Sequence, residues 1–200
     1  MPEKSLDRVL AMIMGAAILT STASAYAFTT AESQNGTPTY IAATSISDAD
    51  FSGLINLVAT VPGLGSITTS CNMDLVFDIN VIGGQAFIEI TSGSLSGAGP
   101  CSFMALGGFP WQASDIPGGA YGWSDTPSPP TDPVTGAIND IEILIAGAPV
   151  CHGSTPVIFN NGAPITTPSS FDFNSFISGN GDCFIDGTLL TPIYGDVNIY

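Results

Sequence analysis

His152 is the only histidine among the 200 residues of this chain. A serine–histidine–carboxylate triad could therefore use only that imidazole. His152 directly follows Cys151, and the sequence has no G-x-S-x-G elbow to carry a nucleophilic serine. We interpret His152 as an ordinary loop histidine, and we expect no catalytic residue and no enzyme.

Carboxylates are the other groups that could carry chemistry. Glycoside hydrolysis requires a pair of them across a cleft, and no pair stands out here. Two clusters place hard oxygen ligands near glycines, namely Asp48 with Asp50, and Asp182 with Asp186. Neither matches the spacing or ligand count of an EF-hand loop. We interpret both clusters as solvated loop carboxylates and expect no metal and no cofactor, although the sequence leaves calcium binding open.

Four cysteines predict two disulfide bonds if the chain is exported, and three connectivities are possible. Two similar stretches favour one of them: residues 95–101 (LSGAGPC) return as residues 177–183 (ISGNGDC). Each copy ends in a cysteine that follows an earlier cysteine by about 30 residues. This half-repeat favours the pairs Cys71–Cys101 and Cys151–Cys183. Each bond would contribute roughly 3–4 kcal/mol by restricting the unfolded chain.

The N-terminus has the pattern of an export signal. Lys4 and Arg8 precede a short apolar run, and Ala25-Tyr26-Ala27 is a small-residue cleavage site. The run is too short to span a bilayer, and no second long apolar stretch follows. We expect residues 1–27 to be removed, leaving a chain without a transmembrane segment that is secreted, periplasmic or attached to the cell surface.

Removal of this segment leaves an acidic chain with no Lys or Arg. Both basic residues lie within 1–27, and Glu3 and Asp7 leave with them, so 15 of the 17 acidic residues remain. Nucleic acid is excluded as a partner, because neutralising phosphates requires Lys or Arg. Like charges would keep the exported protein dispersed in water.

Alternating apolar and polar residues predict an all-β fold. Residues 28–50 are interpreted as a loose leader with a first strand near 39–45, and residues 51–200 as a single domain. Phe51–Val61 favours a strand over a helix, and Leu75–Val81 with Ala86–Thr91 predicts a hairpin turned at Gly83-Gly84. Short strands with turns between them are typical of an antiparallel β-sandwich or Greek-key barrel, here with two disulfides.

Residues 107–136 interrupt this pattern with many Pro and Gly residues, which predicts a long loop. The loop carries most of the aromatic residues that could serve function. We expect Trp111 to belong to the core, and we predict Phe109, Tyr121 and Trp123 to form an apolar contact surface. The alternative is that Trp123 packs the loop onto itself.

The sequence also resembles a known family. The matching stretches are Ser96–Ser102, Gly108-Phe109-Pro110-Trp111 and Cys151, then Gly181-Asp182-Cys183 with Gly187-Thr188-Leu189 and Thr191-Pro192. They are similar to the small exported, four-cysteine proteins of the PraB-type alkane oxidation protein activator family, over roughly residues 51–200. The chain departs from that family in the insertion between Trp111 and Gly136, and in having Phe109 where Leu is usual.

The resemblance implies a secreted accessory protein linked to growth on hydrocarbon, and it transfers no catalytic residue. We therefore expect a non-enzymatic protein that acts at, or binds, an apolar substrate such as an alkane. The alternative is a structural subunit of an extracellular surface layer or fibre. In that case, the polar leader and the C-terminal strand ending at Tyr200 would be exchanged between copies, which predicts self-association.

Overall fold

The computed structural model describes residues 30–33, 40–43, 45–83, 85–124, 132–162, 167–180, 182–192 and 196–199. The expected export signal, 1–27, lies outside the described residues, as do parts of the leader. No helix among the described residues is long and apolar enough to cross a membrane.

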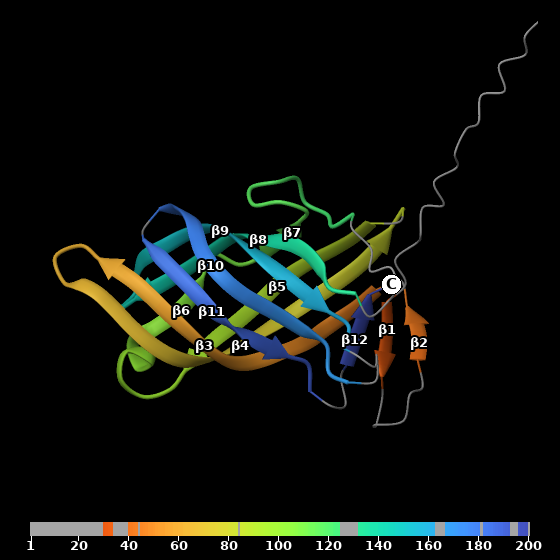
Figure 1. The fold of residues 1–200 in the computed structure, drawn as a ribbon, viewed down its shortest axis with the longest axis horizontal. Helices are drawn as coiled ribbons and strands as arrows, with labels where there is room; N and C mark the ends of the chain where they lie inside the picture. Colours follow the sequence, from red (N-terminus) through yellow and green to blue (C-terminus); the bar gives the residue numbers. More distant parts are fainter. Residues whose placement is uncertain are drawn as a thin grey trace, which may run out of the picture.

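The described chain is built from β-strands and one short 3-10 helix (Figure 1). In order these elements are β1 (Thr30–Ser33), β2 (Tyr40–Ala43), β3 (Ser45–Val61), β4 (Gly65–Ile82), β5 (Gln85–Ser96), η1 (Gly99–Phe103), β6 (Met104–Gly107), β7 (Trp111–Ser114), β8 (Val134–Ile145), β9 (Ala148–Asn160), β10 (Ser170–Asn180), β11 (Cys183–Leu190) and β12 (Asp196–Ile199). The all-β class is confirmed. β3 already begins at Ser45, so the barrel strands start before the expected domain boundary at 51.

The long strands close into an antiparallel barrel. Around the ring, β3 pairs with β4, β4 with β5, β5 with β7, β7 with β8, β8 with β9, β9 with β10, β10 with β11, and β11 with β3. β6 lies end to end with β7 along β8. Apart from the closing pair β11 and β3, neighbouring strands of the barrel are therefore consecutive in the chain, with β6 and β7 together forming one wall strand. This arrangement fits the barrel alternative of the sequence prediction, with up-and-down connections in place of a Greek key.

The inside of the barrel is filled by apolar side chains. On β4, Leu75, Phe77 and Ile79 are at most 1% exposed. Asn80, which follows Ile79, is exposed, as the alternation predicts. The rings of Phe51, Phe77 and Phe171 lie with their centroids 4.7–5.0 Å apart. Close aromatic packing of this kind makes the interior a solid core.

Both disulfides join the cysteine pairs that the half-repeat favours, Cys71–Cys101 and Cys151–Cys183. In each, a cysteine within one strand is bonded to a cysteine just beyond the following strand, with Cα atoms 5.7 and 5.9 Å apart. All four are buried. The bonds therefore fasten two hairpins at equivalent places, β4–β5 and β9–β10.

The Ser-Gly pairs of the half-repeat have a conformational role at these places. Gly97 and Gly179 both have positive φ angles, 143° and 153°, which side chains rarely adopt. A Cβ atom on Gly97 would lie 3.3 Å from Sγ of Cys101, and one on Gly179 would lie 2.1 Å from the carbonyl oxygen of His152. The glycines thus let the chain pass close to the disulfide and to the neighbouring strand.

Candidate functional site: the aromatic loop and the outer face of the barrel

Trp123, which the sequence placed on an apolar contact surface, is buried at 2% exposure. Its main-chain N–H and C=O are both bonded to Ala86 of β5, and the neighbouring Gly122 N–H donates to Ala113 of β7. The segment therefore fills the space where β5 and β7 separate at this end of the barrel. Its indole points inward and packs against Phe159 and Phe171.

The surroundings of Trp123 match both the N–H group and the size of its indole ring. Its Nε1–H donates to the carbonyl of Thr135 at 3.2 Å. A Cβ atom on Gly136 would come within 2.8 Å of the ring, so the glycine leaves the space that the indole occupies. Trp123 is therefore a core residue. This corrects the expectation that it lies on an exposed apolar contact surface.

Phe109 and Trp111 form a stacked pair where β6 meets β7. Trp111 is 1% exposed and donates its indole N–H to the carbonyl of Gly107 at 2.7 Å, which confirms it as a core residue. Phe109 lies on it, with ring centroids 4.7 Å apart, and is half-buried. Phe109 therefore offers only part of one ring to solvent.

Tyr121 is also half-buried and meets Phe87 edge-to-face at 5.2 Å. Burial raises the pKa of its phenol, and the carboxylates of Glu89 and Asp78 raise that pKa further. Beside it lies an open pocket of about 290 Å³ that is lined by Gln85, Asp115, Ile116, Gly119, Ala120, Tyr121 and Gly122. The lining mixes polar and small residues with Ile116 and Tyr121.

The predicted loop is shorter and better held than its composition suggests. Residues 111–114 form β7 and β8 begins at Val134, so the long connection runs from 115 to 133. Asn139 of β8 holds the start of this connection. It accepts a hydrogen bond from the Gly118 N–H and donates one to the Ser114 hydroxyl, both at 2.7 Å. The large apolar side chain that the described part of this connection exposes is Ile116, at 65%.

A larger apolar surface lies elsewhere, on the outer face of the barrel. Phe176 on β10 and Phe184 on β11 are directly opposite each other, and their rings meet edge-to-face at 5.1 Å. Phe184 in turn lies opposite Val58 on β3. Phe176 is 66% exposed. The three side chains form an apolar row across three neighbouring strands.

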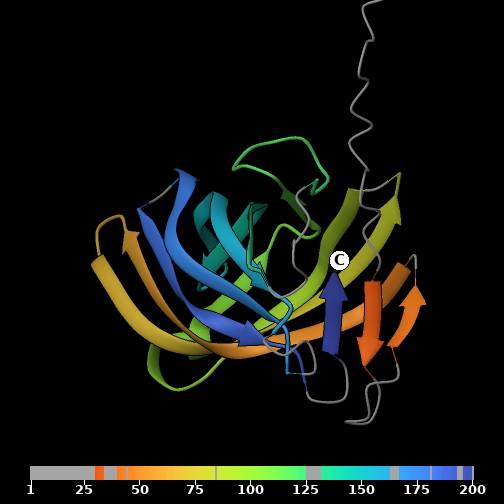
Figure 2. The ribbon, with the colours of Figure 1, turned by 45° about the vertical axis from the view of Figure 1, so that its right-hand side comes forward.

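These three strands and the adjoining β9 carry further exposed aliphatic residues, namely Leu54, Ile158 and Leu190. We call the outer apolar face the set Leu54, Val58, Ile158, Phe176, Phe184 and Leu190. Hydrogen-bonded polar pairs lie among them: Asn56 donates to Asp186, and Thr188 donates to Asp172. Figures 1 and 2 show these four strands running side by side along one wall of the barrel.

Sequence reasoning missed this face, although a signal for it was present. Phe171 and Phe173 point inward, and Ile177 keeps the same parity on the strand, so the even-numbered Phe176 has to point outward. Likewise Cys183 and Ile185 are buried, which turns Phe184 to the outside. Attention to parity rather than to composition would have found both rings.

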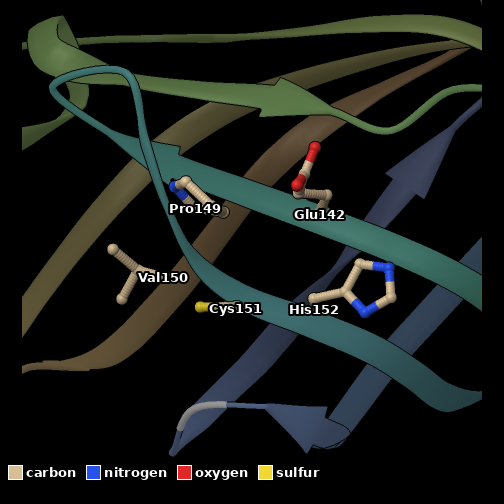
Figure 3. A pocket seen from close by; sticks show the side chains of 5 residues that line it. All are labelled: Glu142, Pro149, Val150, Cys151 and His152. Atoms are coloured by element: carbon tan, nitrogen blue, oxygen red, sulfur yellow. The ribbon is translucent and has the colours of Figure 1, made fainter.

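His152 lies on the outer face of β9, opposite Glu142 of β8 (Figure 3). The two side chains line a shallow pocket of about 240 Å³ with Pro149, Val150 and Cys151. Cys151 is held in its disulfide, so it offers no thiol to this pocket. A lone imidazole beside one carboxylate lacks the nucleophile that a triad requires.

The two acidic clusters named from the sequence take part in strand contacts. Asp48 donates its main-chain N–H to the Asp78 carboxylate at 3.0 Å, and Asp186 accepts from Asn56. Within the described part of the chain, no group of three His, Cys, Asp or Glu side chains is placed to hold a metal ion.

The fold and surface define a disulfide-bonded β-barrel that has a packed interior and an apolar stripe on its outer wall. The model of the alkane oxidation protein activator family, PraA/PraB-like, matches residues 3–197. The chain therefore belongs to that family, and the match extends well beyond the stretches on which the resemblance was first based. No curated protein and no solved structure matches the chain.

Proposed function

We propose that this protein is a secreted, non-enzymatic accessory protein that contacts hydrocarbon through the outer apolar face. Membership of an alkane oxidation activator family supports the link to hydrocarbon. Two disulfides support a route through an oxidising compartment, because such bonds persist in exported proteins.

The packed interior favours contact on the outside. Phe159 and Phe171 lie 5.0 Å apart inside the barrel, and the Trp123 ring packs against both at about 6 Å. The protein's own rings thus occupy the space that a lipid-binding barrel would leave for a ligand. An alkane, which offers no polar atom to recognise, would be met by exposed apolar area.

The observation that carries the proposal is the aromatic pair on the outer face of a regular sheet, in which Phe176 is 66% exposed and Phe184 is half-buried. An aromatic side chain buries on the order of 150–250 Å² on full contact. Together with Val58, which lies opposite Phe184, these rings form a patch of roughly a few hundred Å², near the largest that monomers normally expose. Such patches generally mark interaction sites.

The rest of the surface suits a protein that coats oil in water. The chain beyond residue 27 has no Lys or Arg, so its carboxylates give every coated droplet the same negative sign. Repulsion between droplets would weaken with salt, since the screening length is about 10 Å at 0.1 M ionic strength.

Interfacial tension between hexadecane and water tests the proposal. We expect the wild-type exported protein to lower the tension, and the double variant Phe176→Ser with Phe184→Ser to lose most of that effect. Ile116→Ser is the matched control, because Ile116 is as exposed as Phe176 but lies on the loop. Its activity should stay close to wild type. A folded double variant as active as wild type would refute contact through this face.

A second candidate, a structural subunit of an extracellular layer or fibre, is favoured by one observation. The leader strand β1 pairs with the C-terminal strand β12, so the two segments expected to trade between copies do form one sheet. Electron microscopy of the purified exported protein at rising concentration would show filaments or sheets under this candidate. Uniform single particles throughout would contradict it.

A further inference from the structure

β1, β2 and β12 form a small sheet of their own at one end of the barrel (Figure 2). β1 is the middle strand: its residues Thr30–Ser33 lie opposite Ile199–Asp196 on one side and Ala43–Tyr40 on the other, antiparallel in both cases. The sheet therefore joins the two ends of the chain through β1.

β12 is fastened to the barrel by buried side chains. The Asp196 carboxylate accepts hydrogen bonds from the Ser169 N–H, the Ser169 hydroxyl and the Thr191 hydroxyl at 2.7–2.9 Å. Val197 and Ile199 are at most 2% exposed and belong to the hydrophobic core. β12 is thus a fixed part of the barrel end, although it pairs with none of the barrel strands.

The edge of β12 that faces the barrel is bonded to side chains instead of a neighbouring strand. Asn161 donates its amide to the Ile199 carbonyl at 2.6 Å and accepts from the Ile199 N–H at 2.7 Å. The Ser169 hydroxyl donates to the Val197 carbonyl. Main-chain groups of alternate residues point to opposite edges of a strand, so those of Asp196 and Asn198 are left for β1.

The β1–β2 hairpin has a different kind of attachment. Its described bonds to the rest of the fold are the strand pairs with β12, and a single position, 44, separates β2 from β3. Isolated two-stranded hairpins are marginally stable in water, so a released hairpin would pair again with any free β12 edge. We therefore take the hairpin as the exchanged partner and β12, with its buried side chains, as the fixed one.

We propose that the β1–β2 hairpin of one copy pairs with β12 of a second copy of this chain, in the register seen within one chain. This inference deepens the structural-subunit candidate and rests on it, while contact with hydrocarbon is independent of it. The exchanged pair makes the same main-chain hydrogen bonds as the intrachain pair, so exchange loses no strand pairing. Successive exchange in one direction would produce a chain of subunits, and mutual exchange a dimer.

Disulfide trapping tests the exchange with two variants of the full exported chain, each carrying one added cysteine beside the two native disulfides. Glu32 and Val197 lie directly opposite each other, at a spacing that a disulfide can bridge. We would mix Glu32→Cys protein with Val197→Cys protein, oxidise the mixture, and map the linked peptides with an Asp- or Glu-specific protease. Trypsin is unsuitable because no Lys or Arg follows Arg8.

The expected result is a 32–197 link between the two variants, several-fold more abundant than 32–32 and 197–197 links. The matched control mixes Thr60→Cys with Ser66→Cys, which are opposite each other in the β3–β4 hairpin and cannot exchange without opening the barrel. A 32–197 yield no higher than the 60–66 yield would overturn the exchange. Light scattering separates the two failures: oligomers without the link refute only the exchange, and monomers without the link refute the subunit candidate as well.

Discussion

The connection between β7 and β8 and the outer wall formed by β10 and β11 differ in how far their aromatic rings are exposed. The difference is the opposite of what their sequences suggest. The connection is rich in Pro, Gly and aromatic residues, yet its Trp123 is 2% exposed. The wall consists of regular alternating strands, yet its Phe176 is 66% exposed. The segment with the composition of a binding loop places Trp123 in the core, and the segment with the pattern of ordinary structure exposes Phe176.

This difference shows that the composition of a segment does not determine how far its side chains are exposed. Trp123 is buried because β5 and β7 separate at their ends, and the chain must return there to complete the wall with Ala86 and Ala113. Phe176 is exposed because its strand alternates and the inward positions already belong to Phe173 and Ile177. The position of a ring relative to the barrel therefore decides its role.

The largest predicted effect compares truncation at the two places. Trp123→Ala should lower the free energy of unfolding by about 3–5 kcal/mol, because it leaves a cavity against Phe159 and Phe171 and an unpaired carbonyl on Thr135. Phe176→Ala should lower it by about 1 kcal/mol or less, because an exposed side chain loses only its edge-to-face contact with Phe184. Urea unfolding with the disulfides intact measures both. Equal losses in the two variants would remove the distinction between core loop and exposed wall.

A smaller effect concerns how the connection is held at alkaline pH. The pKa of Tyr121 is raised in the folded protein by burial and by Glu89 and Asp78, so the folded state retains the phenol proton longer than the unfolded chain does. The stability from this group is complete below the unfolded pKa, near 10, and is lost as pH rises through the higher folded pKa.

Stability should therefore fall more steeply above about pH 10 in the wild type than in Tyr121→Phe. Chemical unfolding at a series of pH values compares the two, and the carboxylates common to both cancel in the difference. Parallel curves for the two proteins would show that Tyr121 is not packed among those carboxylates.

Local features of the fold could be predicted from the sequence. Alternation identified the inward residues of β4, and the spacing of Cys71 from Cys101 and of Cys151 from Cys183 favoured the observed disulfides. These features depend on residues that are neighbours in the chain or in a repeat.

Long-range features could not be predicted in the same way. Closure of the ring depends on β11 meeting β3, whose paired residues Cys183 and Ala59 are far apart in the chain. The same holds for the return of Trp123 to Ala86 and for the pairing of β1 with β12. The outer apolar face is assembled from four such strands, so no single stretch of sequence displays it.

The central claim, that the outer wall and not the loop meets hydrocarbon, is tested most directly by a fluorophore at matched positions. Phe176→Cys and Ile116→Cys place the same environment-sensitive dye at sites that are 66% and 65% exposed. On addition of hexadecane droplets, we predict a blue shift of emission at position 176 and little or none at position 116. An equal or larger shift at position 116 would contradict the account.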